Sequence, residues 1–107
     1  MEKLVEVGQL YDIYGALLND KQRDVINCYY NEDLSLNEIA ENNNRSKQAI
    51  SDMIQRSVDK LFEFENELSL LSKREKLRDE LLNIRDLIES SNDKDAIDKL
   101  DMILERI

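Results

Sequence analysis

The sequence contains no proline and no histidine, and only two glycines and one cysteine among its 107 residues. Without proline and with so little glycine, it offers few residues for the tight turns of a β-sheet, whereas its many Leu, Glu, Lys and Ile residues favour helices. Without histidine and with a single cysteine, it lacks the usual means of proton transfer at neutral pH, zinc binding and disulfide formation. We therefore expect an all-α fold in a single domain, residues 1–107, with no metal and no other cofactor.

Long apolar runs and catalytic motifs are also missing. No apolar stretch reaches the length that spans a membrane, and the first residues lack the basic and apolar regions of a signal peptide. No nucleophile–base pair or phosphate-binding loop is visible, and the carboxylates of Glu63, Glu65 and Glu67 are spaced as on a solvated helix face. We therefore expect a cytoplasmic protein that has no membrane contact and is not an enzyme.

The formal net charge of −9 is unfavourable for binding nucleic acid, because Lys and Arg contacts to phosphates supply most of the sequence-independent affinity. The charge is uneven along the chain. Residues 1–20, 21–45 and 63–107 carry −3, −2 and −5, whereas residues 46–62 carry +1. Only residues 46–62 are not acidic, so we expect any binding of DNA to have modest affinity and a steep dependence on salt.

Residues 1–18 are predicted to form an N-terminal helix, because apolar residues recur there at helical spacing. Gly8 and Gly15 lie seven residues apart beside the apolar stripe. Glycine costs a helix about 1 kcal/mol relative to alanine, so the pair indicates either close approach by another helix or local kinking. The predicted stripe consists of Leu4, Val7, Leu10, Tyr11, Tyr14, Leu17 and Leu18.

A three-helix core is predicted for residues 19–66. Asn19 and Gln22 can cap the start of its first helix, which should end near residues 31–33. Its inner face is predicted to consist of Val25, Ile26, Tyr29 and Tyr30, with Cys28 as a small core residue.

Ser35 and Glu38 form a capping box that opens a short helix over residues 36–42, with Ile39 and Ala40 facing inward. A small residue such as Ala40 allows two helices of a helix-turn-helix to cross at close range. Asn42, Asn43 and Asn44 supply the turn, since asparagine tolerates the left-handed conformation. Ser46 then caps a longer helix, whose inner face is predicted to be Ala49, Ile50, Met53, Ile54, Val58, Leu61 and Phe62.

The outer face of this longer helix carries side chains suited to reading DNA. The same residues could form an ordinary solvated helix face without a binding role, but the capped helices and the turn around them favour binding of DNA. The candidate DNA-binding residues are Lys47, Gln48, Ser51, Asp52 and Gln55. The candidate phosphate contacts are Lys21, Arg23, Arg45, Arg56 and Lys60.

Residues 67–107 are predicted to form a C-terminal helical extension. Ser69 or Ser72 could open a helix whose Leu70, Leu77, Leu81, Ile84 and Ile88 follow a heptad pattern. Residues 90–93 should break it before a final amphipathic helix with Ile97, Leu100, Ile103, Leu104 and Ile107. Such a hairpin has too little apolar surface to be stable alone, so it should dock on the first helix or pair with a second chain. We expect a homodimer, with the candidate dimerisation residues Gly8, Gly15, Leu77, Leu81, Ile84 and Ile88.

Residues 18–61 resemble region four of bacterial sigma factors. Gln22-Arg23, the run Leu34-Ser35-Leu36-Asn37-Glu38-Ile39-Ala40, and Ser46 followed by Ala49-Ile50 match its helix openings. About two thirds of the chain also resembles the YlxM family of small helix-turn-helix proteins, through the run of residues 14–23, Tyr29-Tyr30 and Lys60-Leu61. This resemblance implies a regulatory protein that binds duplex DNA. It also implies a link to the signal recognition particle pathway and its components, inferred from gene order.

The turn departs from the family pattern, which has an apolar residue, a glycine and another apolar residue where this chain has Asn43, Asn44 and Arg45. Ser51 occupies a position where the family often has an aromatic residue. A function of a different class also fits the sequence: a protein-interaction module that works through its acidic helical hairpin and keeps the helix-turn-helix as a scaffold.

Overall fold

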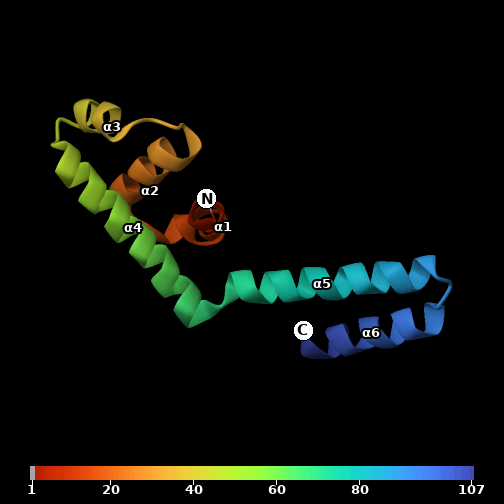
Figure 1. The fold of residues 1–107 in the computed structure, drawn as a ribbon. Coiled ribbons are helices and arrows are strands. Elements are labelled where there is room, and N and C mark those ends of the chain that lie inside the picture. The colour runs from red at the N-terminus through yellow and green to blue at the C-terminus, as the bar shows by residue number, and fades with distance from the viewer. Residues whose placement is uncertain (1) are drawn as a thin grey trace. The chain divides into compact units, whose positions relative to one another are not determined.

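The computed structural model describes residues 2–107, with side chains from residue 4 onward. Residue 1 of the expected first helix lies outside this range. The described residues form six α-helices and no strand, which confirms the all-α class (Figure 1). The helices are α1 (Glu2–Tyr14), α2 (Asp20–Ile26), α3 (Leu36–Asn42), α4 (Lys47–Leu68), α5 (Leu70–Glu89) and α6 (Asp93–Arg106).

The chain divides into two compact units, Met1–Leu71 and Ser72–Ile107. The first unit holds α1 to α4 and the first residues of α5, and the second holds the rest of α5 together with α6. The predicted boundary between residues 66 and 67 falls in the last turn of α4.

The core of the first unit is built on α4, against which α1, α2 and α3 all pack. Ile50, Ile54, Val58 and Leu61 are buried along one side of α4, as the apolar spacing predicted. Ser57 is buried among them, and its hydroxyl donates to the carbonyl of Met53 at 2.8 Å. Its polar atom is therefore satisfied within the helix. The other helices contribute Val7, Leu10, Tyr14, Leu18, Val25, Ile26, Ile39 and Ala40.

Two members of the predicted α1 stripe are exposed, Leu4 at 49% and Leu17 at 57%, and Tyr11 is half-buried. The prediction was wrong at Leu17. The α-helical spacing on which it rests ends at Tyr14, where the chain tightens into a 3-10 turn over Gly15–Leu17. Leu4 lies near the start of α1, where the core does not extend.

The two glycines of the first segment differ in their surroundings. A Cβ atom at Gly15 would lie 3.2 Å from the ring of Tyr11, whereas a Cβ atom at Gly8 would meet nothing within 4 Å. No other helix of the described chain therefore approaches Gly8 closely, and the nearest atoms at Gly15 belong to its own segment. At Gly15 the observed 3-10 turn agrees with the local-distortion alternative.

The start of α2 confirms the predicted cap. The Asn19 side chain accepts from the Gln22 amide at 2.8 Å, and the Gln22 side chain accepts from the Asn19 amide at 3.0 Å. After Ile26 the helix widens into a π-helical turn over Asn27–Asn31. This widening shifts the register, so that Tyr29 is exposed and was wrongly assigned to the inner face.

Cys28 lies in the same turn and is half-buried against the core. Burial raises the pKa of its thiol, and the neighbouring carboxylates of Asp24 and Glu32 raise it further. The thiol therefore stays protonated at neutral pH and is a poor nucleophile. This agrees with its predicted packing role, although the residue is less buried than expected.

The joint between α4 and α5 is held by a hydrogen-bond network. Ser69 adopts a left-handed conformation, with φ 55°, and ends α4. The next two backbone amides are capped from elsewhere: Leu70 donates to the Tyr14 hydroxyl at 3.0 Å, and Leu71 donates to Glu65 Oε1 at 3.0 Å. The Tyr14 hydroxyl itself donates to Glu65 Oε1 at 2.6 Å. Of the two serines predicted to open this helix, Ser69 is the residue that precedes α5.

The surroundings of Tyr14 change the pKa of its hydroxyl. Burial raises the pKa of the Tyr14 hydroxyl, and the hydrogen bond to Glu65 raises it further. The hydroxyl therefore remains a donor to Glu65 at neutral pH.

Replacing Tyr14 by Phe should lower the melting temperature by a few degrees. The variant keeps the buried ring but leaves the Leu70 amide without its acceptor and removes one of the donors to Glu65. Tyr30→Phe is the control, because no hydrogen bond is found for the hydroxyl of this half-buried tyrosine among the described contacts. Thermal unfolding followed by circular dichroism measures both, and equal melting temperatures for Tyr14→Phe and wild type would contradict the role of this network.

The second unit is the expected helical hairpin, and its break lies at the predicted residues. Ser91 is left-handed with φ 61°, and the amide of Asn92 donates to the carbonyl of Leu87 at 2.8 Å. Within this unit the buried apolar residues are Ile84, Ala96 and Ile103. An ion pair between Glu80 and Arg106 also joins the two helices.

Candidate nucleic-acid interface

Helices α3 and α4 form the helix-turn-helix, and the start of α3 is built as predicted. The Ser35 hydroxyl accepts from the Glu38 amide at 3.1 Å, while the Glu38 carboxylate accepts from the Ser35 amide at 3.2 Å. Ile39 and Ala40 are buried at 0% and 6% exposure. The small side chain of Ala40 thus lies on the inner side of α3, the helix that packs on α4.

The turn between these helices depends on its asparagines. Asn43 donates from its side chain to the Ile39 carbonyl at 2.7 Å, and Asn44 adopts the predicted left-handed conformation with φ 51°. The amide of Arg45 then donates to the Ala40 carbonyl at 3.0 Å. These bonds satisfy carbonyls at the end of α3 and fix the direction in which α4 begins.

Replacing Asn44 should test this conformation without touching the core. Asn44→Ala should cost about 1 kcal/mol of folding stability, because alanine is disfavoured with positive φ. Asn44→Gly should cost nothing or stabilise the protein, since glycine carries no Cβ penalty there. Chemical denaturation measures both variants, and an alanine variant as stable as the glycine variant would show that the turn does not require this backbone.

Helix α4 begins with an exposed first turn. The Ser46 hydroxyl accepts from the Ala49 amide at 3.1 Å, which is the predicted cap. Of the five candidate DNA-binding residues, Lys47, Gln48, Asp52 and Gln55 are exposed, and Ser51 is half-buried. Gln48, Asp52 and Gln55 lie on α4 away from its buried stripe, Ser51 borders the stripe, and Lys47 is exposed because it is the first residue of the helix.

Three of these residues, Gln48, Asp52 and Gln55, have hydrogen-bonding partners that were not predicted from the sequence. Gln48 donates from Nε2 to Asp52 Oδ1 at 3.0 Å, and Gln55 donates from Nε2 to Asp59 Oδ1 at 2.8 Å. Both pairs are four residues apart, the spacing at which side chains meet on a helix surface. Because they are exposed, water or a base edge can replace either partner at little cost.

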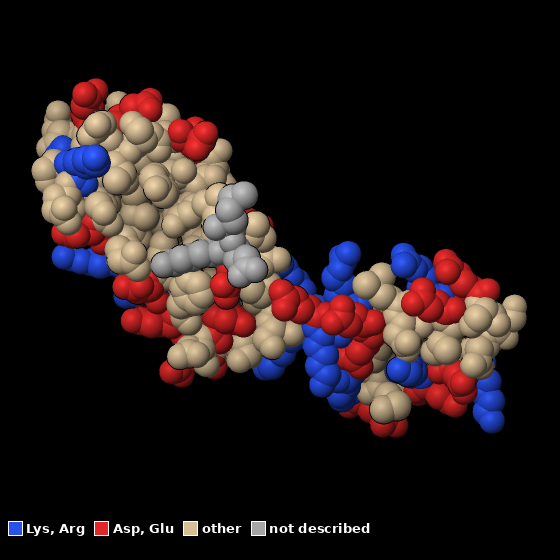
Figure 2. Space-filling view, in the orientation of Figure 1, with Lys and Arg blue, Asp and Glu red and all other residues tan. Residues whose placement is uncertain are grey.

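The candidate phosphate contacts are also on the surface. Lys21, Arg45, Arg56 and Lys60 are exposed, whereas Arg23 forms an ion pair with Asp20 and is half-buried. Figure 2 shows Lys and Arg near the turn that joins α3 and α4, with acidic groups close by. The surface around the start of α4 thus has mixed charge and is not a continuous basic patch.

The described residues hold no group of three His, Cys, Asp or Glu side chains that could bind a metal ion. None of the helices in this part of the chain is both long and apolar enough to cross a membrane.

Comparison with known proteins gives a consistent match. The family model UPF0122, described as "Putative helix-turn-helix protein, YlxM / p13 like", matches residues 1–103. A UPF0122 protein of Clostridium kluyveri is 42% identical over 103 residues, covering 94% of this chain and 93% of the relative. One from Clostridium perfringens is 43% identical over 111 aligned positions, covering 100% and 97%, and one from Fusobacterium nucleatum is 36% identical over 100, covering 94% and 97%.

Proposed function

Because the chain belongs to the UPF0122 family of YlxM-like helix-turn-helix proteins, we propose that it is a non-catalytic, cytoplasmic regulator that binds duplex DNA. The observation that supports this best is the start of α4. It is capped by Ser46, its buried side is fixed by the core, Gln48 and Gln55 lie away from that side in solvent, and Lys47 is exposed at the first position of the helix. This is the geometry with which a recognition helix enters the major groove.

Each group on this face has a suitable role. Gln48 and Gln55 can bond adenine in a bidentate way once they leave their aspartates, and Lys47 can reach guanine or a phosphate. Ser51 can bond several base edges, and Asp52 can accept from cytosine. Phosphates flanking the groove would be contacted by Lys21, Arg23, Arg45, Arg56 and Lys60.

The double variant Lys47→Ala with Gln48→Ala should weaken binding to a duplex selected from a random pool by roughly tenfold or more, since one bidentate base contact is worth about 1–3 kcal/mol. Fluorescence anisotropy measures the affinity, and circular dichroism should show unchanged helicity. Lys99→Ala is the matched control, because it removes the same charge from an exposed position on α6. Equal affinity of the double variant and wild type would count against this face of α4.

The proposal includes a homodimer, because helix-turn-helix proteins commonly read two half-sites with two copies. Of the candidate dimerisation residues, Leu77, Leu81 and Ile88 are exposed, whereas Ile84 is buried inside the hairpin. A substitution at Ile84 would therefore disturb the hairpin itself, and only the exposed residues can test association cleanly.

A connection to the signal recognition particle pathway is the part of the proposal that rests on family resemblance alone. The alternative function, a protein-interaction module, is favoured by the apolar residues exposed on the hairpin. Anisotropy titrations with random duplex and with structured RNA, from low to physiological salt, distinguish these functions. A steep loss of duplex binding with salt would support phosphate contact; RNA binding alone, or no binding even at low salt, would overturn the DNA proposal.

A further inference from the structure

The α5–α6 hairpin exposes more apolar residues than it buries. Its interior consists of Ile84, Ala96 and Ile103, packed with the half-buried Leu87. Two helices with so small an interior do not form a stable unit in water. Six apolar residues exposed on the hairpin form what we call the apolar face: Leu77, Leu81, Ile88, Ile97, Leu100 and Leu104.

These six residues lie on one side of the hairpin. On α5, Leu77, Leu81 and Ile88 are four and seven residues apart and share one face beside the buried Ile84. On α6, Ile97, Leu100 and Leu104 are three and four apart and share a face beside the buried Ile103. In each helix the exposed apolar residues are displaced from the buried residues in the same rotational sense about the helix axis, taken from the N- to the C-terminus. Because the two helices of a hairpin are antiparallel and face each other with their buried sides, displacements in the same sense place both sets of residues on the same side of the hairpin.

The apolar face has edges of opposite charge. Along α5, Arg78 and Arg85 lie three residues before and four residues after Leu81, beside the exposed leucines. A groove of about 420 Å³ runs along this edge, lined by Arg74, Leu77, Arg78, Leu81, Leu82 and Arg85. Residues 73–78 contain four cations and one carboxylate, a net charge of +3 in a chain whose total is −9.

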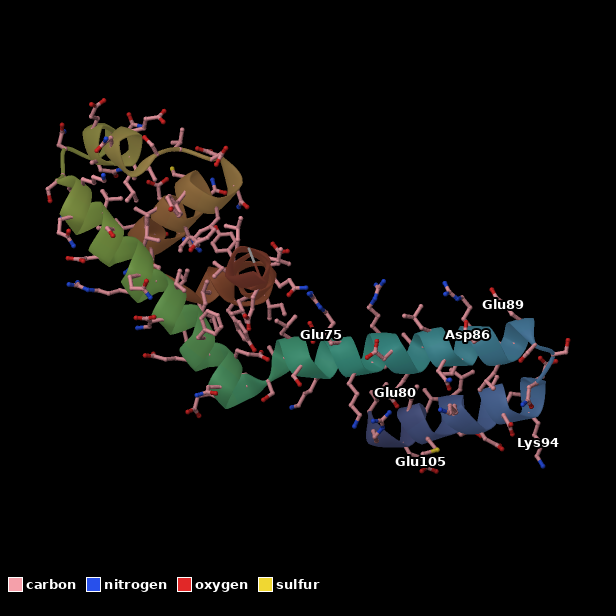
Figure 3. The ribbon with its side chains drawn as sticks, in the orientation of Figure 1. Glu75, Glu80, Asp86, Glu89, Lys94 and Glu105 are labelled. Atoms are coloured by element: carbon pink, nitrogen blue, oxygen red, sulfur yellow. The ribbon has the colours of Figure 1, made fainter. Side chains whose placement is uncertain are left out.

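The opposite edge, along α6, is acidic. Asp101 lies four residues after Ile97 and three before Leu104, so it borders the apolar face. Glu105 follows one turn later, and Figure 3 shows it on the side of α6 away from α5, whereas Glu80 lies between the two helices. The hairpin therefore carries a mainly basic edge on α5 and a mainly acidic edge on α6, interrupted near the loop by Glu89 on the first and Lys94 on the second.

We infer that a second copy of this chain covers the apolar face, so that two hairpins form an antiparallel four-helix bundle in which α5 packs on the partner's α6. The inference rests on the homodimer proposed above and specifies its interface. A two-fold axis parallel to the helices stacks the two apolar faces and brings the basic edge of each hairpin against the acidic edge of the other. The groove along α5 receives the leucine and isoleucine side chains of the partner's α6.

The register of the hairpin identifies the facing charges. Glu80 pairs with Arg106 across the hairpin. Arg85 is five residues after Glu80 and Asp101 is five residues before Arg106, so Arg85 and Asp101 lie at the same level along the axis of the hairpin. A two-fold rotation about an axis parallel to the helices does not change this level, so Arg85 faces the partner's Asp101. By the same geometry, Arg78 lies within one turn of the partner's Glu105.

The same charges disfavour the other way of stacking the two faces. A two-fold axis perpendicular to the helices would pack α5 on the partner's α5 and align the two arginine edges. Like charges held at close range weaken such an interface. The distribution of charge thus selects one of two arrangements that would bury the same apolar residues.

Leu104→Asp tests the covered face, with Met102→Asp as a matched control. Both residues are 65% exposed in the single chain, and they lie two positions apart on α6, which places them on roughly opposite sides of the helix. Sedimentation of the full-length protein over a range of concentrations should show a dimer for wild type and Met102→Asp. For Leu104→Asp the dimer dissociation constant should rise roughly a hundredfold, because an aspartate would be buried against apolar side chains.

Charge reversal tests the arrangement. Arg85→Glu and Asp101→Arg should each raise the dimer dissociation constant about tenfold, and the double variant should recover most of that loss. An Arg85→Glu variant that dimerises more tightly than wild type would instead indicate α5 packed on the partner's α5 and would overturn the inference.

A wild-type chain that stays monomeric at all concentrations overturns the homodimer altogether. A dimer indifferent to Leu104→Asp overturns this interface alone. DNA affinity, measured separately by anisotropy, reports on the α4 face, so neither result can be mistaken for failure of DNA binding.

Discussion

The buried side of α4 is the contact on which the first unit depends. Ile50, Ile54, Val58 and Leu61 meet side chains from the three preceding helices, so one helix organises all the others. Because its inner side is committed to this packing, the opposite side of α4 is left in solvent over its first two turns. The same apolar spacing that builds the core therefore also determines which residues can reach a groove of DNA.

The helix boundaries that could be predicted are those determined by neighbouring residues. Asn19 with Gln22, Ser35 with Glu38, and Ser46 with Ala49 each form bonds over three positions, so the sequence alone contains both partners. The left-handed turn at Asn44 and the break after Glu89 were predictable for the same reason. Local hydrogen-bonding chemistry is independent of the rest of the fold.

Features determined by tertiary packing could not be predicted. The α-helical spacing used for the prediction ends at Tyr14, before the exposed Leu17, and the π-helical turn after Ile26 shifts the register so that Tyr29 is exposed. In the candidate site, the exposure of Gln55 follows from the buried spacing and that of Lys47 from its position at the start of the helix, but the pairing of Gln48 with Asp52 follows from neither. The net charge of −5 for residues 63–107 also gave no sign of the arginine-rich edge of α5, because it sums the charges of a basic edge and an acidic edge.

The network at Tyr14 has a consequence for biosynthesis. The hydroxyl near the beginning of the chain is the acceptor for the amide of Leu70, and it shares the carboxylate of Glu65 with the amide of Leu71. A ribosome must therefore complete more than fifty further residues before Tyr14 finds its hydrogen-bonding partners. Contacts between distant residues slow folding because a long loop must close first. The end of α1 is thus expected to reach its final position in the nascent chain only after the capped pair α3 and α4 has formed.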